Sequence, residues 1–345
     1  MRLVEINYQI FNRFKANDSQ LHTFLSGYDD QWRLTKLVSI KMILEDREKL
    51  KRKLRSFYGP TFKESEDNYI YNESTNGLIF SAISELLMYI EDYLVLISFI
   101  REEEEFIKKV VKYWAGNIGK VPERIKHLSD DDLLKAYMIP NRNFIFEAMS
   151  EQTGEKRDYS IAIYDQGIKN VLEYTKSIID SFNKYRFYYN QYKHGLTVAL
   201  RPFSGSINKV ELHRRKTSLD GFPVCYDNET IEQAFKNGNQ RAFVIPSLTP
   251  EIQPGITKLQ EEQNLLRYHY DGLVDINDLI NIGKKIHLLI RTLIKNRFDF
   301  VIPEKQHANT FYLPYPNKRE NFSFAQILIV PLEKPLSLND FKIKI

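Results

Sequence analysis

Glycine is scarce in this chain of 345 residues, with 14 occurrences. That is about 4% of the positions, against a usual share of roughly 7%. Glycine-rich phosphate loops and repeats with a glycine in every turn are therefore not expected. The nearest approach to a P-loop, at 116–121, lacks both the glycine spacing and the Ser or Thr of that motif, and no Gly-x-Gly-x-x-Gly occurs.

Cysteine occurs once, at Cys225, which excludes an intramolecular disulfide and fits a reducing compartment. The seven histidines are dispersed, and none forms a His-Glu-x-x-His or paired-cysteine signature. We therefore expect no metal and no cofactor, and we interpret Cys225 as a small buried side chain in a strand.

A long hydrophobic run free of charge is also missing. The most apolar stretch, 78–100, contains Ser81, Ser84 and Glu85 and has two adjacent acids near its middle, which disfavours a membrane span. The first residues include acidic and basic side chains that interrupt any signal-peptide core. We expect a cytoplasmic protein with no membrane association.

Neither charge sign is in large excess, because 49 Lys and Arg face 45 Asp and Glu, for a formal net charge of +4. A net charge this small neither predicts nor excludes nucleic-acid binding. Local clusters of basic residues are therefore the evidence to consider. Two basic clusters could contact phosphates, although a solvated basic surface is the simpler interpretation of each. Their members considered as nucleic-acid contacts are Lys51 and Arg52 in a predicted helix, and Arg214 and Arg215 in a predicted loop.

Phe and Tyr are abundant, at 22 and 21, and the overall hydrophobic share of 43% is that of a globular protein. In the first half, apolar residues recur at the helical spacing. The predicted helices are 34–57, 78–114 and 159–194, with a polar loop at 63–76. A further helix should begin after Ser129, which has Asp132 three positions on. We predict a helical bundle over residues 1–197.

The pattern changes after Gly195. Short apolar or alternating segments bounded by Gly, Pro, Asn or Ser predict strands at 196–202, 209–213, 222–226, 241–246, 311–313 and 324–330. One helix is expected at 276–296, capped by Asp275. The predicted fold class is therefore α+β, with the helical bundle followed by a smaller mixed strand and helix region at 198–345.

The helix predicted over 159–194 ends in a polar face. Arg186, Asn190 and His194 are spaced i, i+4 and i+8, so they drift by only roughly 80° in total and share one side, with Lys193 beside them. A cation, an amide and an imidazole could together grip a phosphate and carry a proton. RNA cleavage without a metal needs those functions.

The same residues have a structural interpretation. Basic side chains in a last turn complement the helix dipole, and Gly195 suits a helix end. Arg186 could pair with Glu85 or Asp92. The aromatic residues around the face could stack on unpaired RNA bases, as proposed for Tyr189, or could pack as core. The residues alone leave both interpretations open.

The run Asn190-Gln-Tyr-Lys193-His194-Gly195 at the end of a long helix resembles the signature helix of HEPN-like domains. These are helical-bundle modules of bacterial toxin, abortive-infection and other antiviral systems. The resemblance implies a bundle that commonly dimerises and, in active members, a metal-independent endoribonuclease whose cleft combines two protomers. It implies that His194 is the general acid or base, that Asn190 positions it, and that Arg186 binds phosphate.

The arginine departs from the family pattern, which places it closer to the histidine, with the polar residue directly after it. Here seven residues lie between Arg186 and His194, and Tyr189 directly precedes Asn190.

The polar face and its resemblance lead to two alternative functional hypotheses. One is a homodimeric HEPN-like endoribonuclease of a toxin or antiviral system, acting on RNA. The other is a non-catalytic HEPN-like binding protein that contacts nucleic acid or a defence-system partner protein.

Overall fold

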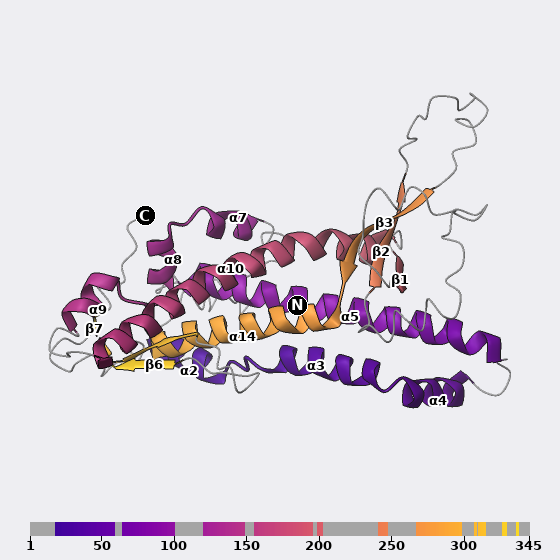
Figure 1. Ribbon diagram of the computed structural model, residues 1–345, viewed down its shortest axis with the longest axis horizontal. Helices are drawn as coiled ribbons and strands as arrows, with labels where there is room; N and C mark the ends of the chain where they lie inside the picture. Colours follow the sequence, from indigo (N-terminus) through magenta and orange to yellow (C-terminus); the bar gives the residue numbers. More distant parts are fainter. Residues whose placement is uncertain are drawn as a thin grey trace, which may run out of the picture. The chain divides into compact units, whose positions relative to one another are not determined.

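The computed structural model describes residues 18–58, 64–100, 120–148, 155–195, 199–202, 241–247, 267–298, 307–308, 310–314, 326–329 and 336–337. This part of the chain is mostly helical (Figure 1). Its helices are α2 (Asp18–Gly27), α3 (Trp32–Glu45), α4 (Arg47–Tyr58), α5 (Glu64–Ile100), α7 (Val121–Lys126), α8 (Asp130–Ala136), α9 (Arg142–Ala148), α10 (Glu155–Gly195) and α14 (Ile276–Phe298).

The described strands form three small antiparallel sheets. The largest has the order β1-β2-β3, built from β1 (Ala199–Pro202), β2 (Arg241–Ser247) and β3 (Arg267–Val274). The other two are pairs: β4 (His307–Ala308) with β7 (Leu336–Ser337), and β5 (Thr310–Leu313) with β6 (Gln326–Ile329).

The contacts divide the chain into two compact units. The first takes its described residues from Met1–Leu34, Met88–Phe182 and Ile282–Ile345, and the second from Thr35–Leu87 and Asn183–Asn281. Helices α5, α10 and α14 therefore each contribute to both units. The domain boundary predicted near residue 197 is not one of these division points and stays a prediction.

Several predicted elements are confirmed. Helix α10 covers the predicted 159–194 and ends at Gly195. Helix α8 begins after Ser129, whose Oγ accepts a hydrogen bond from the Asp132 N–H at 3.1 Å. Helix α14 begins after Asp275, whose Oδ1 accepts from the Asn277 N–H at 2.8 Å. These caps satisfy backbone donors that a helix start leaves without partners.

The helix predicted over 34–57 is two helices, because Asp46 separates α3 from α4. The Asp46 Oδ1 accepts from the Lys49 N–H at 3.2 Å, and its carbonyl accepts from the Leu50 N–H at 2.9 Å. Asp46 thus caps a new helix within a continuous periodic pattern. The apolar spacing alone did not reveal the break.

The polar loop predicted at 63–76 is wrong, because α5 is already helical from Glu64. Thr75 and Asn76 are buried, and the Asn76 Nδ2 donates to the Leu200 carbonyl of β1 at 2.9 Å. The local polarity of this segment indicated a loop. The hydrogen bond from Asn76 to Leu200, a residue 124 positions away, stabilises the helix instead.

Strand predictions at 196–202, 241–246, 311–313 and 324–330 coincide with β1, β2, β5 and β6. Strand β3 was not predicted, since Asp271 and Gly272 interrupt its apolar alternation; it pairs with β2 along its length, with a bulge after Phe243. The strands predicted at 209–213 and 222–226, Cys225 included, lie outside the described residues. The α+β class of the region beyond residue 197 therefore stays a prediction.

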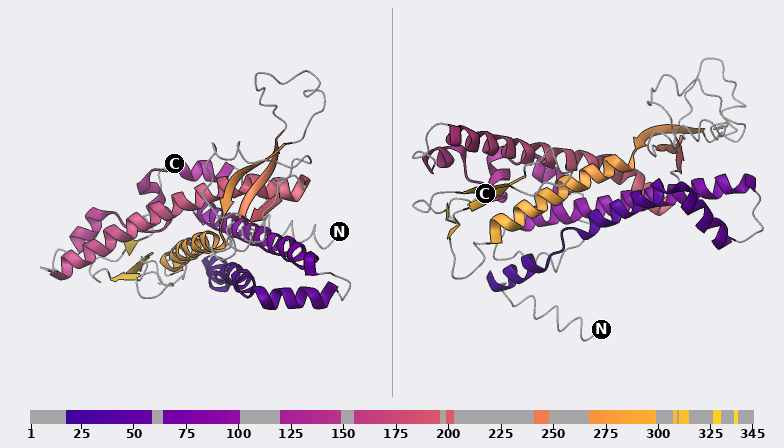
Figure 2. Two further views of the ribbon diagram at one scale, coloured as in Figure 1. Left: turned by 45° about the vertical axis from the view of Figure 1, so that its right-hand side comes forward. Right: turned by 60° about the horizontal axis from the view of Figure 1, so that its bottom comes forward.

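Buried hydroxyls and amides join the elements of the first unit. The Tyr93 hydroxyl of α5 lies 2.7 Å from that of Tyr137 and 2.9 Å from the Thr175 Oγ1 of α10. The Asn296 amide of α14 donates to the carbonyls of Tyr137 and Tyr312 at 2.8 Å and 2.9 Å. Helices α8 and α9 lie beside the first half of α10 (Figure 2).

A second polar cluster of the first unit surrounds Asp30. The Tyr89 hydroxyl donates to the Asp30 carbonyl at 2.6 Å, and the His287 Nδ1 lies 3.5 Å from the Asp30 carboxylate. Arg291 approaches the same carboxylate at 3.8 Å. The segment between α2 and α3 is thereby held against α5 and α14.

We expect Gly167→Ala to destabilise the protein and Gly77→Ala to stabilise it. A Cβ at Gly167 would lie 2.7 Å from the Cβ of Leu313, a fully buried side chain, whereas a Cβ at Gly77 meets nothing within 4 Å. Overpacking should cost about 1–3 kcal/mol at Gly167. The helix preference for alanine should gain up to about 1 kcal/mol at Gly77. Urea unfolding followed by circular dichroism checks both, and equal shifts would contradict the contact with Leu313.

We also expect the stability to decrease at high pH. Burial raises the pKa of Tyr93 from 10.0 to about 12, and burial raises the pKa of Tyr137 as well. Above about pH 10 the unfolded tyrosines lose protons that the folded ones keep, so the free energy of unfolding falls as the pH rises. Tyr93→Phe should make this decrease shallower, measured as urea midpoints between pH 8 and 11. An unchanged slope would exclude Tyr93 as a contributor.

Candidate nucleic-acid interface

The polar face predicted at the end of α10 lies on one continuous helix. Because residues 155–195 are helical throughout, Arg186, Asn190 and His194 keep their i, i+4, i+8 relation. Arg186 is half-buried and Asn190 is exposed. His194 belongs to the last turn, and its side chain lies outside the described part of the structure.

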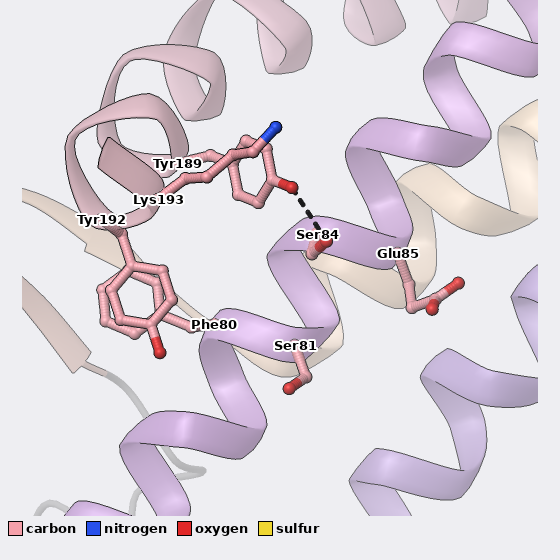
Figure 3. A pocket seen from close by; sticks show the side chains of 7 residues that line it. All are labelled: Phe80, Ser81, Ser84, Glu85, Tyr189, Tyr192 and Lys193. Atoms are coloured by element: carbon pink, nitrogen blue, oxygen red, sulfur yellow. Dashed lines mark hydrogen bonds between the residues drawn. The ribbon is translucent and has the colours of Figure 1, made fainter. Parts of the chain in front are cut away.

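A hollow of about 320 Å³ lies beside this face, between α5 and α10 (Figure 3). Helix α10 contributes Tyr189, Tyr192 and Lys193, and α5 contributes Phe80, Ser81, Ser84 and Glu85. Residues three and four apart share one side of a helix, which explains why these positions line the same space. Two residues predicted as nucleic-acid contacts, Tyr189 and Lys193, are thus brought together.

Aromatic rings form one wall of the hollow. The Tyr192 ring stacks on the buried Phe80 ring, with centroids 3.9 Å apart and an interplanar angle of 8°. Across the hollow, the Ser84 hydroxyl donates to the Tyr189 hydroxyl at 3.5 Å. On α10 itself, the Lys193 Nζ lies 6.0 Å from the Tyr189 ring centroid. The wall therefore combines flat apolar surface with one cation.

The two acids considered as partners of Arg186 each lie within ion-pair distance of a cation on α3. The Glu85 Oε1 lies 3.0 Å from the Lys36 Nζ of α3, within the second unit. Asp92 forms an ion pair with Arg33 within the first unit. The Glu85 side chain is only 14% exposed, and in Figure 3 its carboxylate points away from Tyr189 and Lys193.

Phe243 of β2 fixes the orientation of the last turns of α10. Its fully buried ring stacks on Tyr188 at 3.8 Å and 3°, and its centroid lies 6.4 Å from those of Tyr185 and Phe80. Tyr185 and Tyr188 are therefore core residues. The helical period then turns Tyr189, Tyr192 and Lys193 toward α5 and the hollow.

Burial also shapes the charges at the start of this segment. Burial raises the pKa of Tyr185, and the nearby Asp278 and Asp275 carboxylates raise it further. The pKa of Lys184 is lowered by burial, an effect that Asp278 opposes. The Lys184 Nζ lies over the Tyr185 ring at 4.8 Å.

The remaining predicted cations lie elsewhere. Lys51 is half-buried on α4, and Arg52 is exposed, with its Nε donating to the Glu48 carbonyl at 3.4 Å. Neither lines the hollow. Arg214 and Arg215 lie outside the described residues.

Sequence reasoning missed the contribution of α5 to this site. Ser81 and Ser84 were considered only as interruptions of an apolar stretch, and Glu85 also as a possible ion-pair partner of Arg186. Their spacing of three and four positions puts them on one side of a helix, and this was the available signal. Nothing in the sequence indicated that the same side of α5 would face Tyr189 and Lys193.

Comparisons with protein-family models, curated proteins and solved structures find no match for this chain. The HEPN-like resemblance therefore rests on the residues at the end of α10 and stays a prediction. None of the helices in the described part has the length and apolarity needed to cross a membrane. Within those same residues, His, Cys, Asp and Glu do not gather in threes as a metal site would require.

We expect Phe243→Ala to destabilise the end of α10 and Phe187→Ala to serve as its matched control. Phe243 is fully buried, so its removal should cost about 3–5 kcal/mol. Phe187 is 50% exposed, so its substitution should lower the free energy of unfolding by under about 1 kcal/mol. Chemical denaturation with near-ultraviolet circular dichroism measures both effects. Equal costs would show that the stack on Tyr188 does not anchor this segment.

Proposed function

We propose that this protein is a HEPN-like endoribonuclease of a bacterial toxin or antiviral system, acting on RNA in the cytoplasm without a metal ion. The observation that carries the proposal is the polar face of Arg186, Asn190 and His194 in the last turns of α10. The adjoining hollow supports it, because its aromatic rings and cation suit an unpaired RNA strand.

In the proposed reaction, the 2′-hydroxyl of the RNA attacks the adjacent phosphorus, and the 5′-oxygen of the next nucleotide leaves. One proton must be removed from the nucleophile and one delivered to the leaving group. His194 is assigned to proton transfer, and Asn190 to holding its ring. Arg186 is assigned to the charge that gathers on the phosphoryl oxygens, for which a planar guanidinium fork is suited.

A homodimer would supply the second proton carrier. A base and an acid are needed together, and each chain has one histidine on this face. Two copies of α10 meeting at their C-terminal ends would place a His194 on either side of the scissile bond. Lys193 and Tyr189 would hold the strand, and Lys51, Arg52, Arg214 and Arg215 are further proposed phosphate contacts.

A second function is favoured by the arginine. Seven residues separate Arg186 from His194, and the Arg186 side chain is half-buried while Asn190 is exposed. A guanidinium so placed suits a structural role better than contact with a phosphate. The alternative proposal is a non-catalytic HEPN-like protein that binds nucleic acid or a defence-system partner protein.

The test is cleavage of labelled RNA in the presence of EDTA. Loss of a general acid or base removes roughly 10²–10⁴-fold in rate, and His194→Ala should show a loss of this size. Asn190→Ala should reduce the cleavage rate by a smaller factor, because Asn190 is assigned only to positioning the His194 ring. Lys176→Ala is the matched control on the same helix, at an exposed position away from the hollow, and should cleave like the wild type.

Equal cleavage by wild type and His194→Ala would exclude the enzymatic proposal. RNA binding with no cleavage by either protein would favour the binding protein instead. Thermal melts of each variant separate a lost chemical group from a lost fold.

A further inference from the structure

Positive charge is concentrated in the short helix α4. Six of its twelve residues are Lys or Arg and one is Glu, which gives the helix a net charge of +5. The whole chain carries +4, so all the residues outside α4 together carry a net charge of −1. A polyanion would therefore be attracted to this helix rather than to the protein as a whole.

The cations of α4 lie at its surface. Four of them have exposed side chains, and we refer to these as the α4 cations: Lys49, Arg52, Lys53 and Arg55. The Lys49 Nζ lies 3.8 Å from the Asp46 carboxylate, but both side chains are more than half exposed. Water and salt weaken an ion pair of this kind, so it does not cancel the field of the helix.

The α4 cations occupy the side of the helix opposite its apolar stripe. At about 100° per residue, Leu50, Leu54 and Phe57 fall within roughly 60° of one another. At the same step the α4 cations cover an arc of roughly 160° around the other side. Leu50 and Leu54 are half-buried, so the stripe is the side turned toward the protein and the cationic arc is turned outward.

The exposed groups of α4 suit a phosphate polymer better than a lipid surface. An amphipathic helix binds a membrane by burying a broad apolar face among the lipids. Among the described side chains of α4, Phe57 is the only large apolar one that is mainly exposed, at 81%. One exposed ring beside a broad cationic arc favours contact with phosphates.

Helix α4 belongs to the same unit as the hollow between α5 and α10. It directly follows α3 (Figure 1), and the Lys36 Nζ of α3 lies 3.0 Å from the Glu85 carboxylate of α5. Arg52 follows Lys36 by 16 positions, which is roughly 25 Å or less at the helical rise. A duplex of about ten base pairs is longer than this, at roughly 3 Å per pair. One RNA molecule can therefore lie on α4 and reach the hollow.

We propose that α4 docks the double-stranded stem of an RNA whose unpaired segment enters the hollow, a proposal that rests on the function proposed above. A duplex presents two rows of phosphates, and a cationic arc on a helix about 10 Å across can meet both rows, whereas a single strand offers one. Duplex RNA is recognised largely by such backbone contacts across its shallow minor groove. Contacts to phosphates read no base sequence, so α4 selects the stem by its shape.

The test is equilibrium binding of two RNAs of equal length at several salt concentrations. One is a hairpin with a stem of twelve base pairs, and the other is an unpaired oligouridine. All riboses are 2′-O-methylated, which removes the attacking hydroxyl and separates binding from cleavage. The wild type should bind the hairpin about tenfold more tightly than the oligouridine, because the stem meets more cations.

The double variant Arg52→Gln/Lys53→Gln removes two of the α4 cations. It should weaken the hairpin by about tenfold and reduce the slope of its salt dependence by about two phosphate contacts. The oligouridine should be weakened by about threefold or less, since one strand meets fewer of these cations.

The matched control is the double variant Lys169→Gln/Lys176→Gln. It removes the same charge from two exposed positions on α10 that lie outside α4 and do not line the hollow. It should bind both RNAs like the wild type. Thermal melts confirm that each variant is folded.

Equal weakening of the hairpin and the oligouridine in folded Arg52→Gln/Lys53→Gln overturns the stem-docking surface, as does equal weakening of the hairpin by the control. Tighter binding of a DNA hairpin of the same sequence overturns the RNA assignment. Binding to vesicles of phosphatidylserine and phosphatidylcholine that is lost in Arg52→Gln/Lys53→Gln, with hairpin binding unchanged, assigns α4 to a membrane surface instead.

The function proposed above is tested separately by cleavage of unmodified RNA in EDTA. Hairpin binding that depends on α4 without any cleavage would exclude the endoribonuclease and leave the docking surface in place. Cleavage by a protein that shows no preference for the hairpin would overturn only the docking surface.

Discussion

The stack of Phe243 on Tyr188 is the contact on which the candidate site depends. The two buried rings are nearly parallel at 3.8 Å, and they hold the last turns of α10 against β2. With one side of the helix fixed in this way, the helical period sets where every other side chain of the segment points. Tyr189 and Lys193 are turned toward α5, where the hollow lies. Tyr189 and Tyr192 therefore line the hollow, whereas Tyr185 and Tyr188 of the same helix are buried in the core.

Buried hydrogen bonds fix neighbouring elements against one another elsewhere in each unit. Asn76 ties α5 to β1 in the second unit, and Asn296 ties α14 to the residues after α8 and to β5 in the first. Such groups are costly when left without partners, so each one selects a single arrangement of the elements it joins. Asn76 lies one turn before Phe80 on α5, so the contact that holds Asn76 against β1 also fixes the position of the hollow-lining residues of that helix.

Local signals predicted the helices well where a cap or an apolar face was present, as at Ser129 and along α10. They failed where a distant partner decided the structure. The polar start of α5 looked like a loop because its stabilising contact, from Asn76 to Leu200, joins residues far apart in the sequence. Strand β3 was overlooked for the same reason, since its interrupted alternation is made regular by pairing with β2.

The sequence by itself determined the helix that ends at Gly195, with Tyr189 and Lys193 on one side of it, because helical geometry follows from local spacing. Only the tertiary structure decided which aromatic residues are core and which line the hollow, since that choice depends on Phe243, 55 positions after Tyr188. It also decided that Ser84 of α5 meets Tyr189 of α10. No local pattern encodes which side of one helix will meet which side of another, because packing between distant elements fixes that match.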